Sequence, residues 1–362
     1  MVNRVLRRAG GVAVLLALGG AALLPAGAAA QGPTPPAVTT AGVKFVTSAG
    51  VPIVLRGVNI SDHSRYMTQV PQVGANFVRL RVLWSQVEPA PGVFDTAELA
   101  RLDTFVQYFS AQHIAIELDL RGLPVPSWYG STVGFFRSQA ERSQAAYEPF
   151  VAEIVNRYDS YPWVIGYGIF NEPHPFAPGV GTHGIDQTIL SWQAPIRNEV
   201  LSIDPYRVVF FSVRGGNYGI AQANFKLAGF GLSHTVLDWH DFYNGQHGSG
   251  FDAANDNWVP NWIATHNQMT PTYAGTQLNQ WLNLDIPWKR THLLGIPMIV
   301  GEWGVLNSDP NKSVYDAQMA ALFAKTGVSW ARWDMDNQHL GLIQGGSLNS
   351  EGLWLQGLLT GN

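Results

Sequence analysis

The sequence predicts an α/β protein, a single (β/α)8 TIM barrel preceded by a short N-terminal β-hairpin. Three observations predict it. Apolar, strand-like runs alternate with segments of helical periodicity along the chain. Eight such runs are present, and strands that alternate with helices pair in parallel through right-handed crossovers. No internal repeat or second domain interrupts the pattern, so we expect one domain over residues 43–362.

The expected strands are bounded by polar or glycine-rich segments. They are Val54–Ser61, Phe77–Val82, Ile114–Leu120, Val164–Phe170, Val208–Val213, Val236–Phe242, Pro297–Glu302 and Val328–Trp333. Eight parallel strands close into a barrel whose active site lies at their C-terminal ends. Residues 244–290 are long for one crossover, and we expect an extended loop over the barrel mouth there.

Helical spacing lies between the strands. Asp95–Glu98 has the form of a capping box, and apolar residues then recur at helical spacing through residues 99–109. Residues 150–158 repeat the pattern. Residues 192–200 do so as well, although Pro195 weakens the prediction of a helix there.

The first thirty residues have the form of a secretory signal peptide. Arg4, Arg7 and Arg8 precede an apolar run at residues 12–24, and Ala28–Ala30 supplies small residues for cleavage near Ala30. The alternative is a membrane anchor, but the run is short for a spanning helix. We therefore expect a secreted, extracellular protein without a stable membrane anchor.

The residues after the signal peptide lead into the hairpin. Residues 31–42 are rich in Pro and Thr, and we expect Gln31–Thr40 to be flexible. Lys44–Val46 and Ile53–Leu55 flank the turn residues Thr47–Gly50, which predicts a hairpin whose second strand continues into the barrel.

Composition excludes several classes of protein. The chain has no cysteine, so it forms no disulfide and performs no thiol catalysis. Its net charge is −4, and loss of the three arginines in residues 1–30, which hold no acidic residue, makes it −7. A mildly acidic, aromatic-rich protein is a poor partner for nucleic acid or anionic membranes. We expect a monomer.

Two predicted strands end in a glutamate. Glu172 follows the apolar run of the fourth strand, and Glu302 follows that of the seventh, beside Gly301 and Gly304, which let the backbone turn closely. The fourth and seventh strands lie on opposing sides of a narrow barrel mouth. Two carboxylates roughly 5–5.5 Å apart there have the geometry of a retaining glycosidase. The alternative, a structural ion-pair role, leaves Asn171 and Pro173 unexplained.

At these motifs the sequence resembles glycoside hydrolase family 5, the cellulase-type family of barrel glycosidases, over most of the chain after residue 30. Phe170–Pro173 matches the motif of the acid/base and Gly301–Gly304 that of the nucleophile. The other matches are Leu55–Asn59 and Asn76–Leu80 on the first two strands, Ile196–Arg197 and Asp204–Pro205 before the fifth, His240 and Tyr243 on the sixth, with one extra residue between them, and Trp333 on the eighth.

The resemblance implies a role for each matching residue. Glu172 would be the general acid/base and Glu302 the nucleophile. Asn171 would bind the 2-hydroxyl of the sugar, and Arg79 would keep Glu302 ionised and oriented. The remaining matches, His240, Tyr243 and Trp333, would contact the sugar or Glu302, although His240 could equally be a structural histidine. The mechanism requires no cofactor and no metal.

One residue departs from the family. Arg121 stands at the end of the third strand, where the family usually has histidine, and its contacts beside the sugar are therefore in question. Strand alternation places Arg79 and Arg81 of the second strand inside the barrel, together with Glu117, Asp119 and Arg121 of the third. Because an unpaired buried charge is costly, we expect these charges to form a paired cluster, with Arg79 separated from Glu117 or Asp119 by no more than one water.

The substrate class is a β-glycoside, and we expect an endo-β-glucanase of the cellulase type. Residues 87–95 also resemble endoglycoceramidases of the same family, so cleavage of glycolipids is an alternative, as is a β-mannanase. A non-catalytic sugar-binding protein would have lost one carboxylate, and both are present. Tryptophans could form sugar-stacking platforms or pack in the core, and the candidates are Trp84, Trp128, Trp258 and Trp262.

Overall fold

A computed structural model of the 362-residue chain describes residues 32–61, 63–130, 140–173, 182–212, 231–243, 291–292, 294–309, 312–337 and 339–361. Apart from Gly32, all of these belong to the second of two units, residues 33–362. The expected signal peptide and the expected loop at residues 244–290 lie outside the described residues. None of the described helices is long and apolar enough to cross a membrane.

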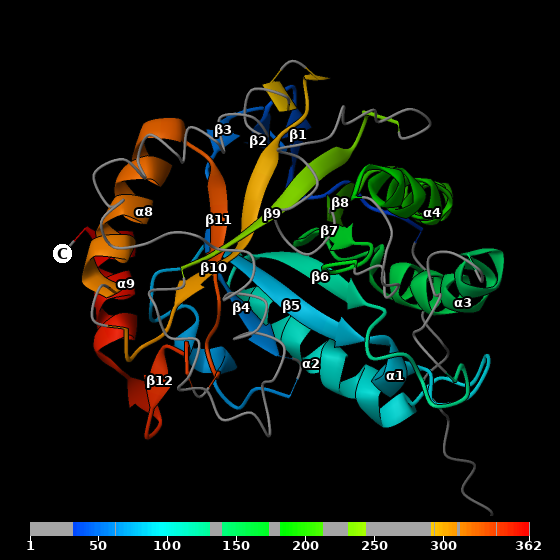
Figure 1. Cartoon of the computed structure of the whole chain (residues 1–362), viewed down its shortest axis with the longest axis horizontal. Coiled ribbons are helices and arrows are strands. Elements are labelled where there is room, and N and C mark those ends of the chain that lie inside the picture. Colours follow the sequence, from blue (N-terminus) through cyan, green and yellow to red (C-terminus); the bar gives the residue numbers. More distant parts are fainter. Residues whose placement is uncertain are drawn as a thin grey trace, which may run out of the picture. The chain divides into compact units, whose positions relative to one another are not determined.

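Eight strands close into a barrel in which every neighbouring pair is parallel, which confirms the predicted fold (Figure 1). The strands are β4 (Arg56–Ser61), β5 (Phe77–Leu83), β6 (Ala115–Arg121), β7 (Val164–Gly168), β8 (Val208–Ser212), β9 (Thr235–Tyr243), β10 (Met298–Val305) and β11 (Ser329–Arg332). Each overlaps a predicted strand. The prediction that the seventh strand ends at Glu302 is wrong, because β10 continues to Val305 and Glu302 lies within it. Strand β7 ends at Gly168 rather than Phe170.

Helices surround the barrel (Figure 1). The described ones are α1 (Trp84–Val87), α2 (Thr96–Ala111), α3 (Ala140–Tyr158), α4 (Thr182–Ile203), α8 (Lys312–Thr326) and α9 (Ser350–Thr360), with a 3₁₀ turn η1 at Met67–Gln69 and a small pair of strands, β12 (Ile343–Gln344) and β13 (Ser347–Leu348). Asp95 caps α2, because its carboxylate accepts from the backbone N–H groups of Ala97 and Glu98. The return bond of the expected capping box is absent, because the Asp95 N–H donates to the backbone oxygen of Val87 instead. Helix α4 continues through Pro195.

The N-terminal segment forms a three-stranded antiparallel sheet, with one strand more than the expected hairpin. Its strands are β1 (Val38–Ala41), β2 (Lys44–Thr47) and β3 (Pro52–Ile53). The expectation that Gln31–Thr40 is flexible is therefore wrong for β1, which pairs with β2 across a turn at Gly42. The second strand of the hairpin was also expected to continue into the barrel. It does not, because β3 ends at Ile53 and β4 begins at Arg56.

The barrel interior has two halves: an apolar base toward the N-terminal ends of the strands and a charged half toward their C-terminal ends. Val38 and Phe45 of the N-terminal sheet join the base, where the rings of Phe45 and Phe210 stack at 6.2 Å. The other buried members are Leu55, Phe77, Ala115, Ile165, Val208, Val236, Ile299 and Ala331. Because side chains two residues apart share a face of a strand, Phe77 is followed inside the barrel by Arg79 and Ala115 by Glu117.

Candidate active site

Glu172 and Glu302 meet at the end of the barrel where the strands finish. One oxygen from each and one ring nitrogen of His240 all lie within 4.8 Å of one another. Both glutamates are buried, with 6% and 1% of their surface exposed. The structure therefore brings together two carboxyl groups that stand 130 residues apart in the sequence.

Glu172 follows β7 in a bend and has a left-handed backbone, with φ of 42°. Its Oε1 lies 2.7 Å from His240 Nδ1 on β9. Asn171, directly before it, accepts a hydrogen bond from Arg79 Nη2 through Oδ1 at 2.8 Å. The amide nitrogen of Asn171 is then the end of its side chain that can donate to a ligand.

Glu302 faces the interior because β10 contains a bulge. Val300 is opposite Trp239 on β9, but Glu302 is opposite His240, so Gly301 is an extra residue. Ile299 belongs to the barrel base and Val300 to the outer core, and strict alternation would therefore turn Glu302 outward. A side chain at Gly301 would also overlap the carboxylate of Asp238.

Arg79 on β5 is the centre of a buried hydrogen-bond network. Its guanidinium donates to Glu302 Oε1 at 2.6 Å. It also donates to Asn59 Oδ1 at 3.2 Å, Glu117 Oε1 at 3.2 Å, Asp119 Oδ1 at 2.9 Å and Asp238 Oδ2 at 2.9 Å, besides Asn171. The predicted paired cluster is confirmed, and Arg79 contacts both Glu117 and Asp119 directly.

Arg121 also contacts Glu302. It donates through Nη2 to Glu302 Oε1 at 2.5 Å and through Nε to Asp119 Oδ2 at 2.6 Å. Its guanidinium carbon lies 5.0 Å from the ring centre of Trp333.

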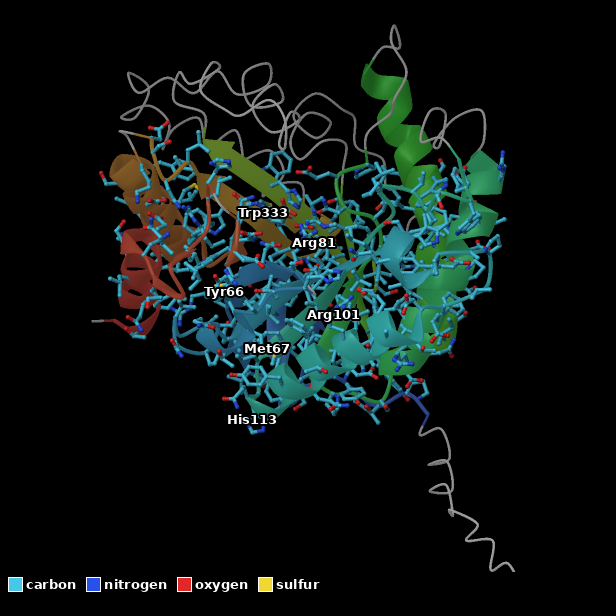
Figure 2. All side chains as sticks on the ribbon, turned by 90° about the horizontal axis from the view of Figure 1, so that it is seen from below. Tyr66, Met67, Arg81, Arg101, His113 and Trp333 are labelled. Carbon is cyan, nitrogen blue, oxygen red and sulfur yellow. The ribbon has the colours of Figure 1, made fainter. Side chains whose placement is uncertain are left out.

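Figure 2 shows Trp333 and Arg81 toward the end of the barrel where the strands finish, and His113, which precedes β6, toward the other end.

Burial and charge shift the protonation of this cluster. Burial raises the pKa of Glu117 well above its usual range, and Arg79 offsets this only in part. Burial also raises the pKa of Glu302, against the opposing effects of His240, Arg121 and Arg79. Burial alone would lower the pKa of His240, but surrounding carboxylates, with that of Glu302 first, raise it to about 10.

Within the described residues, Glu172, His240 and Glu302 have the spacing of a potential metal site. A ligating histidine must be neutral, however. The surrounding carboxylates raise the pKa of His240 to about 10, which favours the imidazolium over the neutral ring that a metal would need. Its Nδ1 faces Glu172 and its Nε2 faces Asp238, at 2.7 and 3.4 Å. The group therefore has the properties of an ion-pair cluster.

Other predicted residues differ in their placement. Tyr243 ends β9 opposite Val305, and its side chain is outside the described part. Trp84 is fully buried and donates to Glu88 Oε2 at 2.7 Å, so it is a core residue and not a platform. Trp128 packs edge-on against Trp84 and donates to the backbone oxygen of Glu88. Trp258 and Trp262 lie outside the described residues.

Sequence reasoning missed two members of the network, Asp238 and Asn59. Asp238 stands two residues before His240 on β9, and this spacing alone would have placed both side chains in the barrel. Asn59 donates to the backbone oxygen of Gly301 at 2.7 Å and accepts from Arg79, so it links the bulge to the arginine.

A closed parallel barrel with two opposed carboxyl groups at its mouth defines a class of protein, the barrel glycosidases. The sequence profile of one family, described as cellulase (glycosyl hydrolase family 5), matches residues 44–339. The chain therefore belongs to glycosyl hydrolase family 5 and is a glycosidase.

Solved structures share this fold. The catalytic domain of the major endoglucanase from Xanthomonas campestris pv. campestris is 18% identical, with a TM-score of 0.63 over 90% of this chain and 100% of that one. An endocellulase from Pyrococcus horikoshii, solved in complex with cellotetraose, is 16% identical, with a TM-score of 0.67 over 91% and 100%. An endoglucanase from Thermobifida fusca, also with cellotetraose, is 18% identical, with a TM-score of 0.59 over 90% and 97%. A comparison with curated proteins found no significant match.

Proposed function

We propose that the protein is a secreted, retaining endo-β-glucanase in which Glu302 is the nucleophile and Glu172 the general acid/base. The observation that carries this proposal is the convergence of the two carboxyl groups at the barrel mouth, within 4.8 Å between nearest atoms. Retaining enzymes hold their carboxyl groups roughly 5–5.5 Å apart, whereas inverting enzymes need about 6.5–9.5 Å to admit a water molecule.

In the first step, Glu302 attacks the anomeric carbon of the sugar while the glycosidic C–O bond breaks. The departing oxygen takes the proton of Glu172, so the leaving chain departs as an alcohol. The product is a glycosyl ester of Glu302. In the second step, water gives a proton to Glu172 and attacks the same carbon, and the Glu302 carboxylate departs with net retention of configuration.

The charges in the cluster support this division of roles. Arg79, Arg121 and His240 supply three positive charges, and His240 donates toward Glu172. They face five carboxyl groups in the described cluster: Glu117, Asp119, Asp238, Glu302 and Glu172. The three cations oppose the rise that burial causes in the pKa of Glu302, which favours the ionised form that a nucleophile needs.

The choice of a β-glucan as substrate rests on the family and the related structures. Two of those related structures contain cellotetraose, a β-glucan fragment. Asn171 supports the proposal at the level of one sugar unit, because its amide can donate to a 2-hydroxyl group. Export rests on the form of residues 1–30.

Reducing-sugar release from a panel of glycans tests the proposal. The panel contains carboxymethyl cellulose, mixed-linkage glucan, laminarin, mannan, xylan and a glycosphingolipid, and the proteins are the wild type, Glu302→Gln and Glu199→Gln. Glu199 is a partly exposed residue of α4 and is the matched control. We expect release from a β-glucan by the wild type and the control and none by Glu302→Gln. Cleavage confined to mannan or glycolipid would mean that this glycan, and not a β-glucan, is the substrate. An active Glu302→Gln would refute the assignment of Glu302 as the nucleophile.

A further inference from the structure

Two arginines bind the same oxygen of Glu302. Arg79 Nη1 lies 2.6 Å and Arg121 Nη2 2.5 Å from Oε1. The second oxygen, Oε2, has a different neighbour, since His240 Nδ1 is 3.5 Å from it. The two oxygens of this carboxylate are therefore in unequal surroundings.

Arg121 itself is fixed on three sides. Its Nε donates to Asp119 Oδ2, its Nη2 donates to Glu302, and its guanidinium lies over the ring of Trp333. Arg121 is 11% exposed, whereas Arg79 is 1% exposed. Arg79 therefore holds Glu302 from inside the barrel, and Arg121 holds it from the side that borders the mouth.

Arg79 alone is a weak source of positive charge for Glu302. It forms ion pairs with four carboxylates, of which Glu117, Asp119 and Asp238 are the other three. A guanidinium shared among four acids stabilises any one of them less than a dedicated partner would. Arg121 has two acidic partners, Asp119 and Glu302, and a permanent charge that histidine does not have.

We propose that Arg121 is a positioning residue for the nucleophile: with Arg79 it binds Oε1 of Glu302, keeps the group ionised, and leaves Oε2 as the oxygen that attacks the sugar. The inference rests on the proposed function and adds the orientation of the nucleophile to it. Oε2 forms the bond to the anomeric carbon, and Oε1 becomes the carbonyl oxygen of the glycosyl ester. When water cleaves the ester, the negative charge returns to a carboxylate that already has two guanidinium partners.

The charge effect on Glu302 agrees with this assignment. Arg121 and Arg79 both lower the pKa of Glu302 against the effect of burial. Loss of Arg121 should therefore raise that pKa further. A residue that only contacted the sugar would leave the titration of Glu302 in the free protein unchanged.

The first experiment measures that titration directly. Side-chain carboxyl signals are followed against pH by 13C NMR in protein with labelled glutamate, and the signal of Glu302 is assigned from its loss in Glu302→Gln. The proteins are the wild type, Arg121→Gln, Arg121→Lys and the control Arg157→Gln, in which an ion pair with Asp103 on the outer helices is lost. We expect Glu302 to titrate at higher pH in Arg121→Gln and at its wild-type pH in the control. An unchanged titration in Arg121→Gln overturns the inference, even for a protein inactive on every glycan.

The second experiment measures kcat and KM against pH on the substrate that the wild type cleaves. For Arg121→Gln we expect kcat/KM to fall by about 10²-fold, with the acid limb moved to higher pH. For Arg121→Lys, which retains charge but cannot bridge Asp119 and Glu302, we expect kcat to fall by roughly 10-fold with KM little changed. Should Arg121→Gln fail to fold, a wild-type kcat in Arg121→Lys refutes positioning. A raised KM with unchanged kcat and acid limb would make Arg121 a substrate contact instead.

Discussion

At the scale of single residues, Glu172 has an unfavourable left-handed backbone conformation, and its side chain lies in the barrel mouth. A non-glycine residue at a φ of 42° costs on the order of 1–3 kcal/mol, which the surrounding structure must offset. The bond from Glu172 to His240 holds the carboxyl group inside the mouth. Strain of this kind is concentrated at functional sites, in agreement with the acid/base role that we propose for Glu172.

Replacing Glu172 should affect substrates according to their leaving groups. For Glu172→Gln we expect cleavage of a β-glucan to fall by about 10²–10⁴-fold, because the departing sugar needs a proton. An aryl glycoside with an acidic phenol needs little protonation, so its first step should be slowed much less. Initial rates on both substrates check this. Equal losses on the two substrates would contradict the acid role.

His240 should make folding stability depend on alkaline pH. Its pKa is raised to about 10 in the folded protein, against about 6.5 when unfolded. A raised pKa stabilises the fold fully below pH ~6.5, and that contribution is lost as pH rises toward about 10. We therefore expect the free energy of unfolding to decline over this range by up to about 1.4 kcal/mol per pH unit.

Urea unfolding at several pH values measures this decline, and His240→Gln is the comparison. The variant should be less stable than the wild type at pH 6 and should show a flatter pH dependence up to pH 9. Parallel curves for the two proteins would mean that His240 is not the titrating group.

At the scale of secondary-structure elements, the bulge in β10 decides which way Glu302 faces. Gly301 is the extra residue, and its missing side chain leaves room for Asp238. Gly168 on β7 has a similar role, because a Cβ there would lie 2.7 Å from Glu117 Oε1. Glycines therefore make room for the buried acids on both sides of the barrel.

Gly301→Ala should disrupt the active site through this lack of space. The methyl group would displace Asp238, which is bound to Arg79 and His240, so we expect a stability loss of about 2–4 kcal/mol and loss of activity. Gly32→Ala is the control, since no atom lies within 4 Å of a Cβ at that position. Thermal unfolding and glucan hydrolysis measure the two effects. Wild-type stability in Gly301→Ala would show that the bulge can shift to accept a side chain.

Element types were predicted better than element ends. All eight barrel strands were found because each contains closely spaced buried apolar residues between polar segments, as at Val208–Ser212. The strand β1 was missed because its Pro/Thr-rich surroundings suggested a flexible segment. Its pairing with β2 and the burial of Val38 under the barrel overcame that local tendency.

At the scale of the whole molecule, one end of the barrel unit is an apolar core that stabilises the fold, and the other end contains the candidate active site. The apolar base is closed by the N-terminal sheet, and the charged half lies above it toward the mouth. The base needs no polar partner. The charged half is held by Arg79, whose ion pairs satisfy acids from β6, β9 and β10 at once.

Phe45→Ala should therefore destabilise the barrel by removing a side chain from its apolar base. Phe45 is 3% exposed and stacks on Phe210, so we expect a loss of about 3–5 kcal/mol in the free energy of unfolding. Val51→Ala, in the same sheet region but 58% exposed, should change it by less than about 0.5 kcal/mol. Chemical denaturation of both variants measures these changes in the free energy of unfolding. Equal effects would mean that the sheet is not a structural part of the base.

The sequence by itself determined the alternation of strands and helices, the presence of Glu172 and Glu302 on the fourth and seventh strand segments, and a paired cluster of charges around Arg79. These follow from local periodicity and from the cost of burying an unpaired charge, which act along each strand. Only the tertiary structure decided that Glu302 faces inward, that Asp238 and Asn59 join the network, and that Arg121 shares Oε1 with Arg79. The physical reason is that a bulge and barrel closure bring distant strands together, and one extra residue reverses the face on which a side chain lies.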